Sequence, residues 1–291
     1  MRKPDFRVTT RNGLIKGKGP GIIAMTIGRI AAGVFVVLWA TGFVGAKFGL
    51  PYAGPMTFLT IRFSLVALAM LLFAAAFGGL REVDWRGAAL IGVLIHGTYL
   101  GTVFTAISLG AGAAISALIV SMQPLVTIAF ARAMLGEQLT HRQWLGIGLG
   151  MFGATLVVIR KLDGGEIDPI GVGLCLIGLL AISYSSVLQK RRNIQKGMVA
   201  DSAVQFAAAA IATGVLAFAF ETQPVQWTGE FFFALAWMCV VLSLGAVTLL
   251  YYLIRRGAAS QTASLFFLVP GVTALMAWAM FGEEFGPLEL A

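Results

Sequence analysis

The chain carries the segment AAISALIVSMQPLVTIAFARAMLGEQLT at residues 113–140 and a second version of it, ASQTASLFFLVPGVTALMAWAMFGEEFG, at residues 259–286. The two align without a gap at a constant offset of 146, and ten of the 28 positions are identical. The identities include Pro124 with Pro270 and the Gly-Glu dipeptide that follows each apolar run. Self-similarity at a fixed spacing indicates a duplicated architecture, and this duplication decides the fold.

The composition around these segments is typical of a protein embedded in lipid. The 291 residues are 58% hydrophobic and only 12% charged. A soluble domain carries roughly 25% charged residues, and its surface needs them. The composition therefore excludes a soluble enzyme, a soluble nucleic-acid-binding domain and a disordered scaffold.

The apolar segments predict nine membrane-spanning helices, because a helix crosses a bilayer with about 20 apolar residues. They lie at residues 30–50, 55–77, 87–109, 112–135, 142–159, 169–189, 202–220, 231–253 and 260–281. The repeated segment is the fourth and the ninth of these spans, so the repeat unit has five helices. A unit with an odd number of spans crosses the membrane in opposite directions in its two copies.

We therefore predict an all-α polytopic membrane protein built from two inverted five-helix repeats. Its parts are a basic cytoplasmic tail at 1–28, a first repeat at 29–160 and a second repeat at 161–291. The second repeat holds only four predicted helices. We expect a ten-helix fold whose last helix is missing from this chain, and we interpret the chain as truncated.

The net charge of +8 predicts an orientation. With the N-terminus in the cytoplasm, 17 of the 21 Lys and Arg lie on the cytoplasmic side and three lie outside, while Arg62 lies within a span. This bias follows the positive-inside rule and predicts a multi-pass protein of the inner (plasma) membrane with a cytoplasmic N-terminus. No motif supports a nucleic-acid partner.

Inverted repeats are a recurrent architecture of secondary transporters, whose substrate site lies near the bilayer midplane between the halves. A channel or a non-transporting membrane scaffold is the alternative. The sequence has no GxxxxGK[ST] loop for ATP, and its two Cys and two His lack the spacing of a metal site. Neither GxSxG nor a paired intramembrane carboxylate occurs, so we predict no enzyme activity, no cofactor and no metal.

Several motifs occur in a recognisable order: Trp39 within LWATGFVGAKFG at 38–49, an Arg-Phe pair in the second span, a midspan proline in the fourth and ninth, and Gly-Glu turns after them. This order resembles the EamA-type transporters of the drug/metabolite transporter superfamily over residues 29–291. The resemblance implies ten helices and the export of small metabolites, amino acids among them.

Polar and aromatic side chains at bilayer depth mark candidate sites, because burying polar groups in lipid is costly. We predict that substrate contacts come from Trp39, His96, Tyr99, Gln123, Tyr184 and Gln261. A lining of aromatic, hydroxyl and amide groups without a central carboxylate suits a neutral or zwitterionic, partly apolar solute. The alternatives are a histidine bonded to a neighbouring carbonyl, interhelical hydrogen bonds from the polar residues, and plain aromatic packing.

Three further residues lie in midspan. Pro124 and Pro270 each remove a backbone hydrogen bond and are predicted hinges for alternating access, with a static packing kink as the alternative. Arg62 is favoured as a structural residue that snorkels outward or binds carbonyls, rather than as a substrate contact. A weaker alignment at offset 143 pairs it with Gln205, so the repeat does not require a charge there twice.

Overall fold

The structure is a computed structural model that describes residues 22–77, 83–136, 168–192, 197–246 and 265–282, together with scattered positions within 144–159 and Leu249 and Leu253. All regular secondary structure in these residues is helical. The predicted fifth span at 142–159 lies largely outside the described residues, as do most of the basic tail and Gln261.

The helices follow one another along the chain with short connections. They are α1 (Ile22–Gly49), η1 (Leu50–Tyr52), α2 (Pro55–Phe77), α3 (Trp85–Gly92), η3 (Val93–Leu100), α4 (Gly101–Ser108), α5 (Ala113–Ser121), α6 (Gln123–Leu135), α8 (Pro169–Arg192), α9 (Met198–Phe220), α10 (Gly229–Ala236), η4 (Trp237–Ala246), η5 (Phe266–Leu268) and α13 (Val269–Phe281). Of these, η3 and η4 are π-helical, and η1 and η5 are 3₁₀ turns.

Seven helical runs are long and apolar enough to cross a membrane, and they agree with seven of the nine predicted spans. They cover Ile30–Tyr52, Pro55–Ala76, Trp85–Ser108, Ala113–Leu135, Pro169–Arg192, Met198–Phe220 and Gly229–Ala246. The described part of the predicted ninth span, Phe266–Phe281, is a shorter apolar helix. The prediction of an all-α polytopic membrane protein is confirmed.

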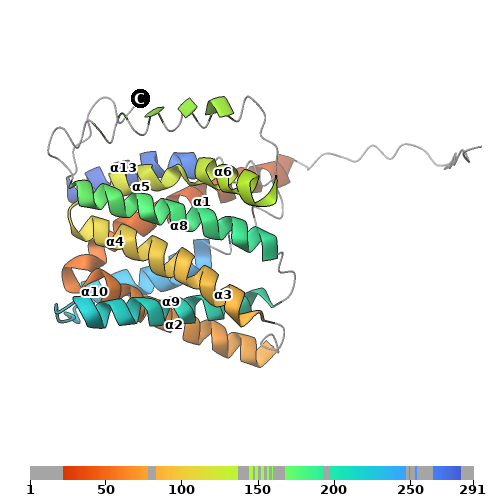
Figure 1. The fold of residues 1–291 in the computed structure, drawn as a ribbon. Coiled ribbons are helices and arrows are strands. Elements are labelled where there is room, and N and C mark those ends of the chain that lie inside the picture. Colours follow the sequence, from red (N-terminus) through yellow and green to blue (C-terminus); the bar gives the residue numbers. More distant parts are fainter. Residues whose placement is uncertain are drawn as a thin grey trace, which may run out of the picture.

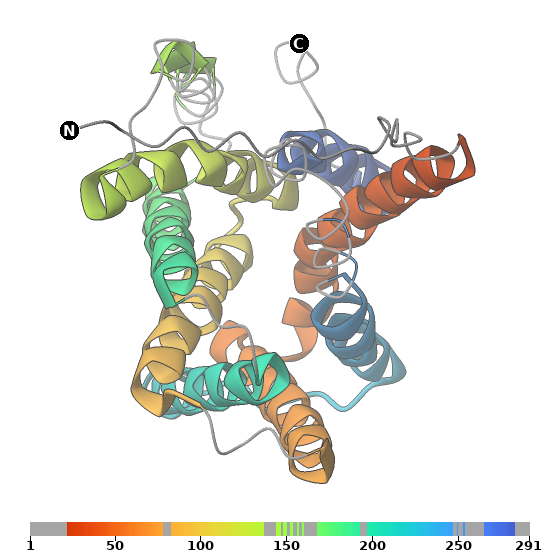
Figure 2. The ribbon, with the colours of Figure 1, turned by 90° about the vertical axis from the view of Figure 1, so that its right-hand side faces the viewer.

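The helices lie roughly parallel and form a closed ring (Figures 1 and 2). Around the ring, α13 contacts α1, α1 contacts α10 and η4, and η4 contacts α2. The ring continues from α2 to α9, from α9 to α3 and η3, and from these to α8. Both α5 and α6 contact α8, and α5 closes the ring by its contact with α13.

The contacts within the ring occur in matched pairs when the chain is divided between α6 and α8. The first helix of each part packs against the fourth helix of the other part, α1 with α13 and α8 with α5 and α6. The first helix of each part also packs against the third helix of the other part: α1 packs against α10 and η4, and α8 packs against η3 and α4. The two second helices, α2 and α9, pack against each other. The irregular segments correspond as well, since the third helix of each part contains a π segment and the fourth is interrupted beside a proline.

Both midspan prolines interrupt their helices. Helix α5 ends at Ser121, and α6 begins at Gln123 with Pro124 as its second residue. Pro270 is likewise the second residue of α13, which follows the 3₁₀ turn η5. Proline has no N–H to donate to the preceding turn, and the backbone tightens locally instead: the Met122 N–H donates to the Ile119 carbonyl at 3.2 Å. The structure therefore places a helix break at each proline.

Polar groups at the two ends of α9 join it to neighbouring helices. At its C-terminal end, the Glu221 carboxylate accepts hydrogen bonds from the backbone N–H groups of Met56 and Thr57, at 2.7 and 2.8 Å. These donors belong to the first turn of α2, where a negative charge is favourable. At the other end, Asp201 pairs with Arg192 of α8 at 2.8 Å.

The α3–α9 contact depends on a glycine. A Cβ added to Gly92 would overlap the backbone carbonyl and Cα of Gln205, whereas a Cβ on Gly97, one turn and a half further along the same span, would meet only the Ala212 and Val93 side chains at ordinary distances of 3.7 and 3.9 Å. Small residues allow this close approach between helices in a membrane.

We predict that Gly92→Ala destabilises the protein and Gly97→Ala does not. The added methyl group must push α9 away, and overpacking of this kind costs about 1–3 kcal/mol. Thermal unfolding of the purified protein in detergent measures the difference. An equal melting temperature for the two variants would show that the α3–α9 contact does not depend on Gly92.

Candidate functional site

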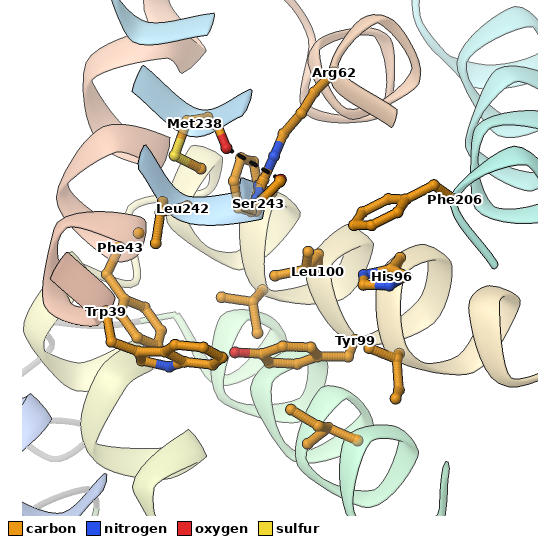
Figure 3. A pocket seen from close by; sticks show the side chains of 15 residues that line it. Trp39, Phe43, Arg62, His96, Tyr99, Leu100, Phe206, Met238, Leu242 and Ser243 are labelled. Carbon is orange, nitrogen blue, oxygen red and sulfur yellow. Dashed lines mark hydrogen bonds between the residues drawn. The ribbon is translucent and has the colours of Figure 1, made fainter. Parts of the chain in front are cut away.

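A cavity of about 120 Å³ lies inside the ring (Figure 3). One buried water needs roughly 10–15 Å³ on this scale, so the cavity has room for a solute of amino-acid size. Its walls come from α1, α2, η3, α4, α8, α9 and η4. The lining residues are Trp39, Gly42, Phe43, Arg62, Ile95, His96, Tyr99, Leu100, Val103, Phe104, Ile182, Phe206, Met238, Leu242 and Ser243.

The aromatic wall of the cavity is built by packing between rings. Trp39 of α1 lies at 5.3 Å from the ring of Phe35 and edge-on to Phe266 at 5.2 Å. Such tilted and edge-to-face contacts are the favourable arrangements for aromatic pairs. They hold the indole in one orientation at the boundary between α1 and η5, so its face is fixed before a solute arrives.

The π-helical segment η3 supplies two of the predicted site residues, His96 and Tyr99. The His96 ring stacks on Phe206 with a centroid distance of 4.1 Å and an interplanar angle of 18°. Tyr99 is buried, and Figure 3 shows its hydroxyl directed toward the side of the cavity on which Trp39 lies. Single π turns within α-helices occur frequently at functional sites.

Arg62 of α2 extends into the cavity wall, and only 6% of it is exposed. Its Nη2 donates a hydrogen bond to the Ser243 hydroxyl at 3.1 Å, and that hydroxyl donates to the Met238 carbonyl at 3.1 Å. The guanidinium carbon lies 5.6 Å from the centre of the Phe63 ring. The sequence predicts that Arg62 snorkels outward or binds carbonyls; it is instead buried in the cavity wall, and its recorded side-chain hydrogen bond goes to a hydroxyl of η4.

A second, smaller cavity of about 10 Å³ shares Trp39 and Tyr99 with the first. It lies at both proline breaks, since its lining includes Gln123 on one side and Phe266 and Val269 on the other. The Gln123 side chain also donates to the Ser186 hydroxyl at 3.3 Å. Gln123 therefore joins α6 to α8 and lines the small cavity at the same time.

Two predicted site residues remain, Tyr184 and Gln261. Tyr184 of α8 is 38% exposed, packs against Phe130 at 5.6 Å and lines neither cavity. Gln261 lies outside the described residues.

The sequence reasoning missed the apolar lining, notably Phe43, Phe206 and Leu242, because it ranked polar and aromatic side chains in selected spans. One signal was available for Phe206, which aligns with Phe63 in the weaker repeat register at offset 143.

Comparison with known proteins gives a consistent picture. The EamA-like transporter family matches residues 26–159 and again residues 169–291. The inner membrane transporter YedA of Escherichia coli K12, described as uncharacterized, is 26% identical over 259 residues, which is 87% of this chain and 82% of YedA. The uncharacterized transporter YvbV of Bacillus subtilis is 26% identical over 88% of this chain and 83% of its own length.

Two further similarities are partial or structural. A probable amino-acid metabolite efflux pump of Escherichia coli K12 is 27% identical over 162 residues, or 56% of this chain and 53% of that protein. One solved crystal structure of another protein superposes with a TM-score of 0.64 over 91% of this chain and 92% of that chain, at 18% identity. This second similarity concerns the fold.

The family match covers most of the chain, and the relatives that align over most of their own length are described as transporters. We conclude that the chain belongs to the EamA-like transporter family and is a multi-pass inner membrane transporter.

Proposed function

We propose that the protein exports amino acids or similar small metabolites by alternating access around the central cavity. The observation that carries the proposal is a cavity of solute size, lined by both parts of the chain and enclosed by the ring of helices. Its lining combines fixed aromatic faces with a few polar groups, as small-molecule sites do. The similarity to a probable amino-acid metabolite efflux pump favours an amino-acid-like solute.

In this proposal the two repeats, 29–160 and 161–291, are inverted halves that rock against each other, with the N-terminus in the cytoplasm. The matched helix contacts and the recurrence of π segments and proline breaks support equivalent halves. Inverted halves with a site between them are the usual basis of alternating access. The charge bias of 17 to three supports the orientation.

Pro124 and Pro270 are the proposed hinges. Their breaks line one small cavity that adjoins the main one. Helix α5, which ends just before the Pro124 break, contacts α13, which carries Pro270. A helix that lacks a backbone hydrogen bond at one position bends there with a smaller loss of free energy than elsewhere. Bending at these breaks would therefore change the shape of the cavity directly.

Trp39, His96 and Tyr99 are the proposed substrate contacts in the main cavity, and Gln123 is the proposed contact in its small extension. Tyr184 lines neither cavity and packs against Phe130, which favours a packing role for that residue.

The test of transport is counterflow in proteoliposomes. Vesicles preloaded with an unlabelled amino acid should take up the same labelled amino acid transiently above equilibrium, because a carrier exchanges solutes one site at a time. A screen across the amino acids and their simple derivatives finds the substrate. Uptake that never exceeds equilibrium would favour a channel, and no uptake of any solute would favour a scaffold.

A matched pair of aromatic variants tests the site. Trp39→Ala removes a wall of the cavity and should raise the half-saturation concentration for transport by roughly tenfold, the effect of losing a buried aromatic contact of about 1.5 kcal/mol. Tyr184→Ala removes an aromatic ring outside the cavity and should leave that concentration unchanged. Equal effects of the two substitutions, at equal expression, would remove Trp39 from the site.

A further inference from the structure

The guanidinium of Arg62 has unused hydrogen-bond donors. An arginine side chain carries five N–H donors, and the structure records one side-chain hydrogen bond from this group, to Ser243. Its Nε is buried and has no hydrogen-bond partner among the described residues. The residues that line the cavity include no Asp or Glu, so the described lining supplies no negative charge to balance Arg62.

This arrangement is costly unless something else completes it. A charged side chain in the interior of a membrane protein is usually paired, and an unsatisfied buried donor costs free energy. Two carboxylates of neighbouring helices already have partners: Asp201 forms a salt bridge with Arg192, and Glu221 accepts hydrogen bonds from the first turn of α2. A ligand that brings its own negative charge into the cavity would recover this cost.

Ser243 fixes the orientation of the guanidinium. Its hydroxyl donates to the Met238 carbonyl, so it presents a lone pair to Arg62 Nη2. This bond holds one edge of the guanidinium against η4. Figure 3 shows Arg62 and Ser243 on one side of the cavity, with Trp39 and Tyr99 on the other.

The wall opposite Arg62 is apolar and aromatic, so it favours a ligand whose uncharged part is apolar or aromatic. A carboxylate matches the planar fork of a guanidinium and forms short, charge-assisted hydrogen bonds with it. A single cationic group balances a single negative charge. An apolar or aromatic tail would then lie against Trp39 and Tyr99 (Figure 3).

Building on the proposed transport function, we infer that Arg62 binds the carboxylate of the transported solute, with Ser243 as its positioning residue. The cavity then selects solutes that combine one carboxylate with an apolar or aromatic tail, and it discriminates against amides and amines of the same shape.

Three ligands with one tail test this selection on the wild-type protein: 3-phenylpropionate, 3-phenylpropionamide and 3-phenylpropylamine. We expect 3-phenylpropionate at millimolar concentration to raise the melting temperature of the purified protein. We expect the amide and the amine to bind roughly 10- to 100-fold more weakly, the effect of losing a hydrogen bond to a charged group. Equal stabilisation by all three ligands, or no stabilisation by the carboxylate, would overturn the inference.

Variants test whether the stabilisation by 3-phenylpropionate depends on Arg62 and Ser243. Arg62→Met should abolish the stabilisation by 3-phenylpropionate, Arg62→Lys should restore part of it, and Ser243→Ala should weaken it. Arg86→Met, which neutralises an exposed arginine at the start of α3, should leave it unchanged. Full stabilisation of Arg62→Met by the carboxylate would overturn the inference. If Arg62→Met does not fold, the ligand series on the wild-type protein decides alone.

The outcomes separate this inference from the proposed function. Selective binding of the carboxylate without counterflow of any solute would keep Arg62 as an anion-binding residue and refute transport. Counterflow that is equally inhibited by the acid, the amide and the amine would keep transport and refute the role of Arg62.

Discussion

The hydrocarbon of a bilayer neither donates nor accepts hydrogen bonds, so a membrane-spanning chain can depart from the α-helix only where other protein groups or an internal cavity surround the departure. This constraint explains the positions of four irregular segments. The π segments η3 and η4 line the main cavity, and the breaks beside Pro124 and Pro270 line its small extension. The irregular backbone of the described spans is thus concentrated around one internal space.

The same constraint places the polar side chains. Arg62 and Ser243 meet inside the ring, while Glu221 and the Arg192–Asp201 pair lie at the helix ends. The regular parts of the helices are held by close packing, as at Gly92. Each proline break beside the cavity lacks one backbone N–H donor, and we propose that the cavity wall bends there. A cavity wall that is easier to deform than the ring around it is what alternating access needs.

Much of this organisation was predictable from the sequence, and the reasons are physical. Span positions follow from the length of apolar runs, and the breaks follow from proline chemistry. The orientation of a residue around its helix axis was harder to predict, because α2 and α8 are apolar on nearly all sides and their periodicity does not identify an inward face. For this reason the sequence favours outward snorkelling or carbonyl binding for Arg62, which the structure places in the cavity wall, and a substrate contact for Tyr184, which is partly exposed, packs against Phe130 and lines neither cavity. The π segments have no sequence signature that we could use.

The most direct test of the central claim is the accessibility of the cavity wall from each side of the membrane. Leu242 lines the cavity, and a Leu242→Cys variant in a background without Cys175 and Cys239 reports on it. A membrane-impermeant thiol reagent should label this cysteine in right-side-out and in inside-out vesicles, and a transported solute should slow both reactions. Labelling from one side only, under all conditions, or labelling that no transported solute affects, would contradict alternating access around this cavity.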